Sequence, residues 1–179
     1  MAGKEIQARI VRELRTRLHL KDVVSEWRIS KNATDTFNDE HVYIPRPDIA
    51  VGPFNVTVEN KARDRNAIWA FNPPLMANIF LAIARQNEFL RENSNPRCAI
   101  AIEVEHNTSS KHILGAITNV SMLGRVGVVV GSKESIKKIE RIYAYARKLR
   151  QIEKGPRDMF GNVGCFSEAE FHQLLRQSR

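Results

Sequence analysis

Two strand-like segments on either side of a helix constrain the fold of this chain more than any other part of the sequence. The segments CAIAIEVE (98–105) and VGVVVGS (126–132) are mainly apolar, which is typical of strands that a sheet buries on both faces. Between them, SSKHILGAITNVSML is expected to form a helix with Ser109 or Ser110 as its N-cap. A strand, a helix and a buried strand form a βαβ unit, whose two strands lie parallel. The sequence therefore predicts an α/β fold with a covered sheet.

The rest of the sequence supplies further helices and strands around this unit. Residues 4–20 are expected to form an amphipathic helix, because isoleucine or leucine recurs every four residues from Ile6 to Leu18. Ser167 and Glu170 make a capping box at the start of a last helix. The remaining expected elements are a strand at 23–30, two strand-like runs between 42 and 61 separated at 52–54, a helix from 73 to about 93, a helix at 133–152 and a strand at 162–166.

The overall composition indicates one globular domain. The chain has 179 residues, with no repeat and no linker that would divide it. It contains no run of about 18 apolar residues and no signal-peptide core at its start, so we expect a cytoplasmic protein that does not span a membrane. The two cysteines, Cys98 and Cys165, lie far apart without ligand spacing and are expected to be reduced and buried.

The charge balance favours an anionic partner. The formal net charge is +8, and for a cytoplasmic protein nucleic acid is the leading polyanion. The five histidines form no HExxH motif or Cys/His cluster, which argues against a structural zinc site. The sequence contains neither a P-loop nor a GxGxxG motif after a strand, which argues against nucleotide-driven enzymes.

Two carboxylates at the end of the first buried strand need a stabilising partner. Glu103 and Glu105 are two residues apart, so both side chains project from the same face of the strand, where they repel each other and resist desolvation. Asp48 lies in a second strand-like run, RPDIAV. If the two strands are neighbours, the three carboxylates converge near the strand ends, where α/β sheets hold ligands. A bound Mg²⁺ would offset their repulsion, since a few carboxylates and water suffice to hold it.

The order Pro47-Asp48, then Glu-x-(Lys or Glu), after a leading helix and strands resembles the PD-(D/E)xK nuclease superfamily. The segments RPDIAVGPF and AIEVEHNTSSKHILG also look like those of uncharacterised bacterial proteins assigned to it. The resemblance covers roughly residues 4–131 and implies a restriction-endonuclease-like αβββαβ core with a mixed sheet flanked by helices. Residues 55–96 would then be a helical insertion and residues 133–179 a C-terminal helical extension.

The motif fits this sequence in two registers. The first joins Asp48 to Glu59 and Lys61, which keeps the lysine usual in the family and needs a hairpin turning at Pro53 and Phe54. The second joins Asp48 to Glu103 and Glu105, so that a glutamate stands in the usual lysine position. We favour the second, because the family's central β-α-β element matches residues 98–131 better than anything directly after Lys61.

The resemblance implies a nuclease that hydrolyses DNA phosphodiester bonds with Mg²⁺ or Mn²⁺. Asp48 and Glu103 would bind the metal, and Glu105 would bind a second metal or orient the nucleophile. Lys111 would take the place of a lysine that has moved to the next helix, and Glu13 is a further acid that some members place on the first helix. A restriction, repair or recombination endonuclease is the main expectation, with RNA left open as a substrate and a homodimer suited to cutting two strands.

The main alternative is a catalytically inactive module of the same fold that binds nucleic acid or a protein partner. The glutamate in the usual lysine position keeps this alternative open. The basic helix expected within residues 133–157 is compatible with either function, because lysine and arginine on one helix can track a phosphate backbone.

Overall fold

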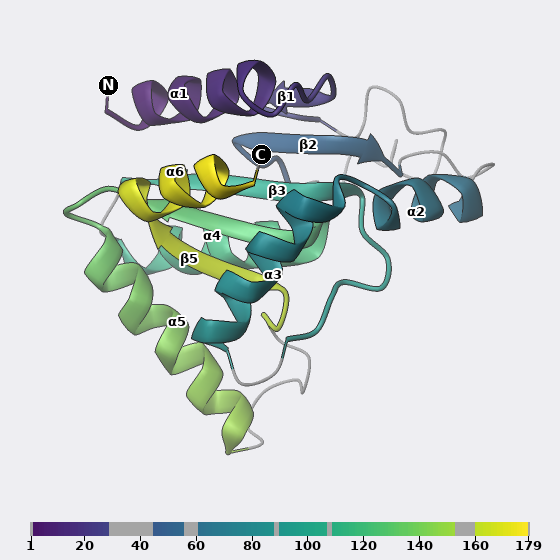
Figure 1. Cartoon of the computed structure of the whole chain (residues 1–179). Helices are drawn as coiled ribbons and strands as arrows, with labels where there is room; N and C mark the ends of the chain where they lie inside the picture. The colour runs from purple at the N-terminus through teal and green to yellow at the C-terminus, as the bar shows by residue number, and fades with distance from the viewer. Residues whose placement is uncertain are drawn as a thin grey trace.

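A computed structural model of the chain describes residues 2–28, 45–55, 61–87, 90–106, 109–152 and 160–178. Within these ranges the chain alternates between helices and strands as an α/β protein does (Figure 1). The elements are α1 (Ala2–Thr16), β1 (Val23–Ser25), β2 (Ile49–Phe54), α2 (Lys61–Trp69), α3 (Pro73–Gln86), β3 (Cys98–Glu105), α4 (Ser110–Leu123), β4 (Gly124–Gly131), α5 (Ile136–Gln151), β5 (Val163–Ser167) and α6 (Glu168–Gln177).

The strands form one mixed sheet of five strands in the order β1-β2-β3-β4-β5. The pairs β1–β2 and β2–β3 are antiparallel, whereas β3–β4 and β4–β5 are parallel. The expected βαβ unit is therefore confirmed, with α4 as its crossover helix. The α/β class and the mixed sheet are confirmed as well.

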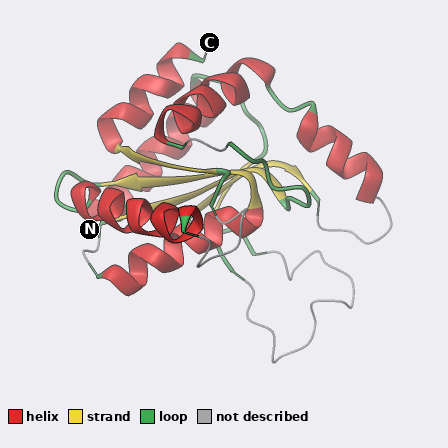
Figure 2. Cartoon of the chain, turned by 90° about the horizontal axis from the view of Figure 1, so that it is seen from below, coloured by secondary structure: helices red, strands yellow, loops and turns green. Residues whose placement is uncertain are grey.

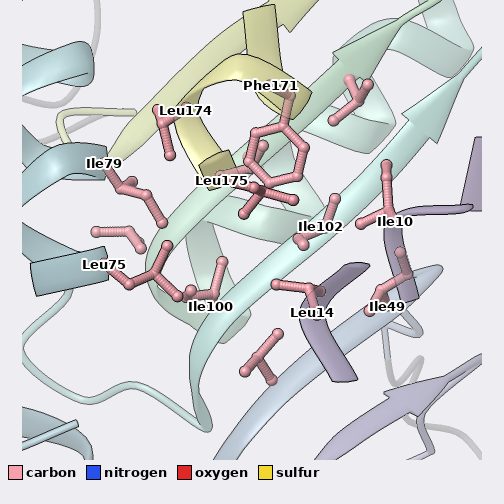
Figure 3. Packing of buried hydrophobic residues seen from close by; sticks show 14 of the residues in the cluster. Ile10, Leu14, Ile49, Leu75, Ile79, Ile100, Ile102, Phe171, Leu174 and Leu175 are labelled. Atoms are coloured by element: carbon pink, nitrogen blue, oxygen red, sulfur yellow. The ribbon is translucent and has the colours of Figure 1, made fainter. Parts of the chain in front are cut away.

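Helices cover both faces of the sheet (Figure 2). The alternation of side chains along β3 explains the two cores, because Ile100 and Ile102 face one side and Ala101 faces the other. Helices α1, α3 and α6 cover the first side, where Ile10, Phe171 and neighbouring aliphatic residues pack on the strands (Figure 3). Helices α4 and α5 cover the second side. This second face also receives the odd-numbered residues at the end of β3.

A glycine allows α4 to lie close to the sheet. A Cβ atom on Gly127 of β4 would come within 2.7–2.9 Å of Val120, including the backbone carbon of that residue. Any larger residue would push α4 away from the sheet. The helix begins at Ser109 as N-cap, as expected, although the Ser109 side chain makes no capping hydrogen bond.

Several expected boundaries were wrong. The strand expected at 23–30 is limited to Val23–Ser25, and the helix expected to reach residue 93 ends at Gln86. After it, Asn87 is extended, and its buried side chain donates to the Tyr143 hydroxyl at 3.2 Å. This tertiary contact, which periodicity does not reveal, fixes where the helix stops.

The segments on either side of the central unit agree with expectation only in part. No separate element was expected at residues 62–69, directly after the strand-like run that was to end at Lys61, but residues 61–69 form the helix α2. The strand expected at 162–166 is confirmed as β5, so the C-terminal extension is not purely helical. This strand joins the sheet parallel to β4 and completes a second β-α-β connection through α5. The capping box of Ser167 and Glu170 at the start of α6 is confirmed.

The sulfur chemistry agrees with the sequence analysis. Cys98 and Cys165 are free and buried, and burial raises the pKa of both thiols. Among the described helices, none alone is long and apolar enough to cross a membrane. Only the pair 63–69 and 73–86, bent by 70°, meets that test by length and composition.

Arg125, at the start of β4, fastens α2 and the segment after α3 to the sheet. Its guanidinium binds both carboxylate oxygens of Glu92, at 2.7 and 3.2 Å, and donates to the carbonyl oxygens of Ile68 (3.4 Å) and Trp69 (2.9 Å). It also lies over the Trp69 ring, 4.1 Å from the ring centroid. The side chain is 10% exposed, so few of these contacts are replaced by water if it is lost.

We expect Arg125→Met to lower the free energy of unfolding by about 2–4 kcal/mol, because it leaves a carboxylate and two carbonyl groups without their donor. Urea unfolding followed by circular dichroism measures the change. The control is Arg63→Met, which removes an ion pair with Asp64 whose arginine is 78% exposed and is expected to change stability by less than about 0.5 kcal/mol. Equal effects in the two variants would contradict this role for Arg125.

Candidate active site

The sheet places Asp48 opposite Glu103. In the antiparallel pair β2–β3, Ile49 is the partner of Ile102, so the next residues outward are Asp48 and Glu103. Cross-strand partners point to the same face, here the one covered by α4. Because β3 and β4 run parallel, Glu103 also lies near the carboxyl ends of the parallel strands, where α/β sheets place their ligand sites. The expected convergence of Asp48 with Glu103 is therefore found.

Hydrogen bonds fix the position of Asp48 from three directions. Its Oδ2 accepts from the backbone N–H of Val104 at 2.8 Å. Its backbone carbonyl accepts from Nε2 of Gln7 on α1, at 2.7 Å, and from the backbone N–H of Glu26, at 2.8 Å. The carboxyl group is thus held by β3, and the backbone beside it is held by the first helix and the β1 side.

Burial is the main reason that the two carboxyl groups titrate abnormally. Burial, followed by the nearby charge of Asp48 and the hydrogen bond to it, raises the pKa of Glu103 from 4.5 to about 8, against a smaller lowering by Asn119. Burial also raises the pKa of Asp48, opposed chiefly by the Val104 N–H. Near neutral pH the pair therefore retains a proton, with Glu103 as its main holder.

Asn119 on α4 supports Glu103. Its Nδ2 donates to Oε1 of Glu103 at 3.1 Å. Each carboxyl group therefore has one oxygen bound by a protein N–H, Asp48 from β3 and Glu103 from α4. Such contacts limit the rotamers of both side chains, so the pair is arranged before any ligand arrives.

Glu105 shares the face of Glu103 but is one step further along the strand. In the parallel pairing Glu103 is the partner of Val129 and Glu105 of Gly131. The charge of Glu105 contributes to the raised pKa of Glu103, so it belongs to the same electrostatic neighbourhood. Within the described residues, no three Asp, Glu, His or Cys side chains form a group that could hold a metal ion. Of the three carboxylates expected to converge, Asp48 and Glu103 are the two that lie directly opposite each other.

Lys111 is not brought to the pair. It is exposed on the first turn of α4, and Val120, nine residues later and buried against the sheet, points half a turn away from it. Asn119, which does reach Glu103, lies about 12 Å further along the helix axis. No hydrogen bond or ion pair joins Lys111 to Asp48 or Glu103, whose described side-chain partners are the Val104 N–H and Asn119.

The register through Glu59 and Lys61 lacks its hairpin. Pro53 and Phe54 are not a turn but the end of β2, which pairs with β1 on one side and β3 on the other. Lys61 is the first residue of α2. Glu59 lies outside the described residues. The hairpin that this register needs is not formed, because β3 takes the partner position beside β2, with Ile49 opposite Ile102.

Glu13 belongs to a different cluster. Its Oε2 lies 2.8 Å from Nδ1 of His172 on α6, and the other nitrogen of that imidazole lies 3.4 Å from Glu168. Glu168 in turn pairs with Arg9 at 2.7 Å. These contacts join α1 to α6, so the expectation that Glu13 supports the site was wrong.

Four neighbours of the pair were not among the predicted site residues. Gln7 and Asn119 donate the hydrogen bonds described above, while the charges of His106 and Glu26 act on the pKa of Asp48 in opposite directions. Asn119 left little signal, because Thr118 and Ser121 beside it on the helix are polar as well. Gln7 left none, because it is one of several polar residues on α1.

No family model, curated protein or solved structure matches this chain.

Proposed function

We propose that this chain is a nuclease that hydrolyses DNA phosphodiester bonds with Mg²⁺ or Mn²⁺, on a restriction-endonuclease-like fold. The observation that carries the proposal is the meeting of Asp48 and Glu103 on adjacent strands, at the carboxyl ends of the parallel strands. Two buried carboxyl groups in contact are costly unless a proton or a cation lies between them. Structural proteins have little reason to keep such a pair, whereas metal-dependent hydrolases do.

The order of elements supports the fold part of the proposal. Elements α1, β1, β2, β3, α4 and β4 follow the α-β-β-β-α-β order, with three antiparallel strands followed by a parallel one. Helices α2 and α3 lie between β2 and β3, in the place of the expected insertion. Asp48 and Glu103 then stand at the positions of the two acidic residues of the PD-(D/E)xK motif.

The donor set suits a hard divalent cation. Mg²⁺ binds oxygen ligands and is commonly held by one or two carboxylates with water completing its shell. Asp48 and Glu103 would hold it. When bound, the metal polarises a phosphoryl oxygen and lowers the pKa of a coordinated water.

The other residues of the site have roles that follow from their positions. Asn119 and the Val104 N–H keep one oxygen of each carboxyl group in place, so the remaining oxygens are directed without a further loss of side-chain entropy. Glu105 projects from the same face two residues beyond Glu103, where its carboxylate can orient a water molecule and accept its proton.

The test is cleavage of supercoiled plasmid in Mg²⁺ or Mn²⁺, with EDTA as the metal-free arm. We expect nicking by the wild type, its loss in EDTA, and a rate lowered at least about 100-fold in Asp48→Asn. The matched control, Glu5→Gln, removes an exposed carboxylate of α1 and is expected to keep the wild-type rate. Glu59→Ala is also expected to keep it, and loss of nicking in that variant would move the site to the other register.

A binding module without chemistry is the second candidate, and a specific observation favours it. The usual lysine position holds Glu105, and Lys111, exposed on the first turn of α4, makes no hydrogen bond or ion pair with Asp48 or Glu103. Without a cation beside them, the charge that develops on phosphorus has one stabilising group fewer. Salt-sensitive DNA binding, with no cleavage of plasmid, single-stranded or branched DNA by the wild type in either metal, would replace the nuclease proposal with this one.

A further inference from the structure

A basic cleft runs between α3 and α5, on the side of the molecule where β5 ends the described sheet. The lower end of α3 lies beside the middle of α5 in Figure 1. The cleft has a volume of about 710 Å³. Its lining consists of Arg85, Gln86, Lys137, Glu140, Arg141, Tyr143, Ala144, Arg147 and Cys165.

The charge of this lining is strongly one-sided. It contains four cationic side chains against one carboxylate, Glu140, which leaves a net charge of +3. Arg85, Lys137 and Arg141 are exposed, and none of them forms an ion pair with a described residue. Cations gathered in a concave site without partners raise the local concentration of anions.

The wall of the cleft is built by side chains that are themselves held in place. Arg147 donates through Nη1 to the backbone carbonyl of Gln86 and lies over the Tyr143 ring, 5.2 Å from its centroid. Its buried Nε has no acceptor among the described residues. The Gln86 amide binds both backbone groups of Cys165, at 2.7 and 2.9 Å. Because this amide occupies the edge of β5, the cleft is not suited to an added β-strand.

Three of the four cations of the cleft lie on α5, whose start is bound to the end of β3. Ser135 Oγ donates to the backbone carbonyl of Glu105 at 2.6 Å, and the Ser132 N–H donates to the same oxygen at 3.4 Å. The start of α5 is therefore fastened to the end of β3, two residues beyond Glu103. Lys137 follows in the first turn of α5, and Arg141 lies one turn, about 6 Å, further along the axis.

We propose that this cleft binds the phosphate backbone of the nucleic acid whose cleavage is proposed above, so the inference rests on that function. The cations are spread along successive turns of α5 and onto α3, which suits a chain of phosphates better than one small anion. Tyr143, the aromatic ring in the lining, is buried, and its hydroxyl is already hydrogen-bonded, so it offers no surface for stacking on a base. We therefore expect binding in the cleft to depend on the charge of the phosphates and not on the base sequence.

The experiment compares two triple variants with equal loss of charge. The cleft variant carries Arg85→Gln, Lys137→Gln and Arg141→Gln. The control carries Lys4→Gln, Arg12→Gln and Arg65→Gln, which are exposed cations of α1 and α2. Binding of fluorescent duplex and single-stranded DNA of mixed sequence is measured by anisotropy in EDTA, over a range of salt, so that cleavage does not interfere.

We expect the cleft variant to bind DNA at least about 10-fold more weakly and to lower the slope of log affinity against log salt by about 2–3, since each lost phosphate contact removes just under one unit. The control is expected to stay within about 3-fold of the wild type. Arg85→Lys, Lys137→Arg and Arg141→Lys together keep the charges and are expected to restore binding. Equal losses in the cleft variant and the control, or no DNA binding by the wild type, would overturn the proposal.

Two further arms separate the remaining outcomes. Calorimetry with pyrophosphate tests whether the cleft instead binds a small anion. If the wild type binds pyrophosphate tightly, and the cleft variant loses this binding but still binds DNA like the wild type, the proposal that the cleft binds a nucleic-acid backbone is wrong. Plasmid nicking in Mg²⁺ is measured in parallel. If the wild type binds DNA through the cleft but never cleaves it, the proposed DNA binding in the cleft is supported and the proposed nuclease activity is rejected. If the wild type cleaves DNA and the cleft variant binds DNA as well as the wild type does, only the proposed DNA binding in the cleft is rejected.

Discussion

Replacement of Glu103 by glutamine is expected to lower metal-dependent DNA cleavage at least about 1000-fold while making the metal-free protein more stable near pH 8. Glutamine keeps the shape of the side chain and can still accept from Asn119, but it cannot supply the negative charge that a divalent cation needs. The substitution also removes the negative charge of Glu103, which both burial and the nearby charge of Asp48 destabilise. A variant that loses activity by misfolding would instead lose stability.

The two effects are measured on the same preparation. Plasmid nicking in Mg²⁺ gives the rate, and thermal unfolding in EDTA at pH 8 gives the stability. Glu5→Gln, at an exposed position of α1, serves as the control and is expected to leave both unchanged. If Glu103→Gln unfolded at a lower temperature than the wild type at pH 8, the account of Glu103 as a buried, repelled carboxylate would be wrong.

The metal-free protein is expected to become less stable as the pH rises from about 5 to 8. The pKa of Glu103 is raised from an ordinary value of 4.5 to about 8, so within this range the folded state holds a proton that the unfolded state has released. Stability falls with pH wherever the folded state binds more protons. Below pH 4.5 Glu103 is protonated in both states and adds no cost, whereas above pH 8 it contributes the whole cost, roughly 3–5 kcal/mol.

Urea unfolding in EDTA at several pH values measures this dependence. Asp48 adds to it with the same sign, because burial raises its pKa as well. Glu103→Gln is expected to remove most of the slope. Mg²⁺ is expected to restore stability more at pH 8 than at pH 6, because it competes with a proton at the lower pH. A wild type whose stability is flat across this range would show that the pair is charged and paired with another group.

The central part of the fold and the pairing of Asp48 with Glu103 could be predicted from the sequence. The apolar runs at 98–105 and 126–132 are too hydrophobic for an exposed position, and the helix between them leaves only a parallel arrangement. The strand period of two placed Glu103 on a definite face. The short apolar run after Asp48 then made a neighbouring strand a reasonable expectation.

The contacts of Lys111 could not be predicted from the sequence. A helix that follows a strand can be recognised from its sequence, but the direction of each side chain depends on which side of the helix the sheet buries. Here Val120 faces the sheet and Lys111 therefore points outward. Asn119, from the same helix, reaches Glu103 instead.

Local patterns in this sequence determined the central βαβ unit, most of the helices and the fact that Glu103 and Glu105 share a face of their strand, because burial and side-chain period act over a few residues. The tertiary structure alone decided which distant groups complete the site. From helices on opposite faces of the sheet, Gln7 donates to the backbone carbonyl of Asp48 and Asn119 donates to the carboxyl group of Glu103, while Ser135, just before α5, donates to the backbone carbonyl of Glu105. Such contacts join residues far apart in the chain, and their energies depend on a packing that no short stretch of sequence contains.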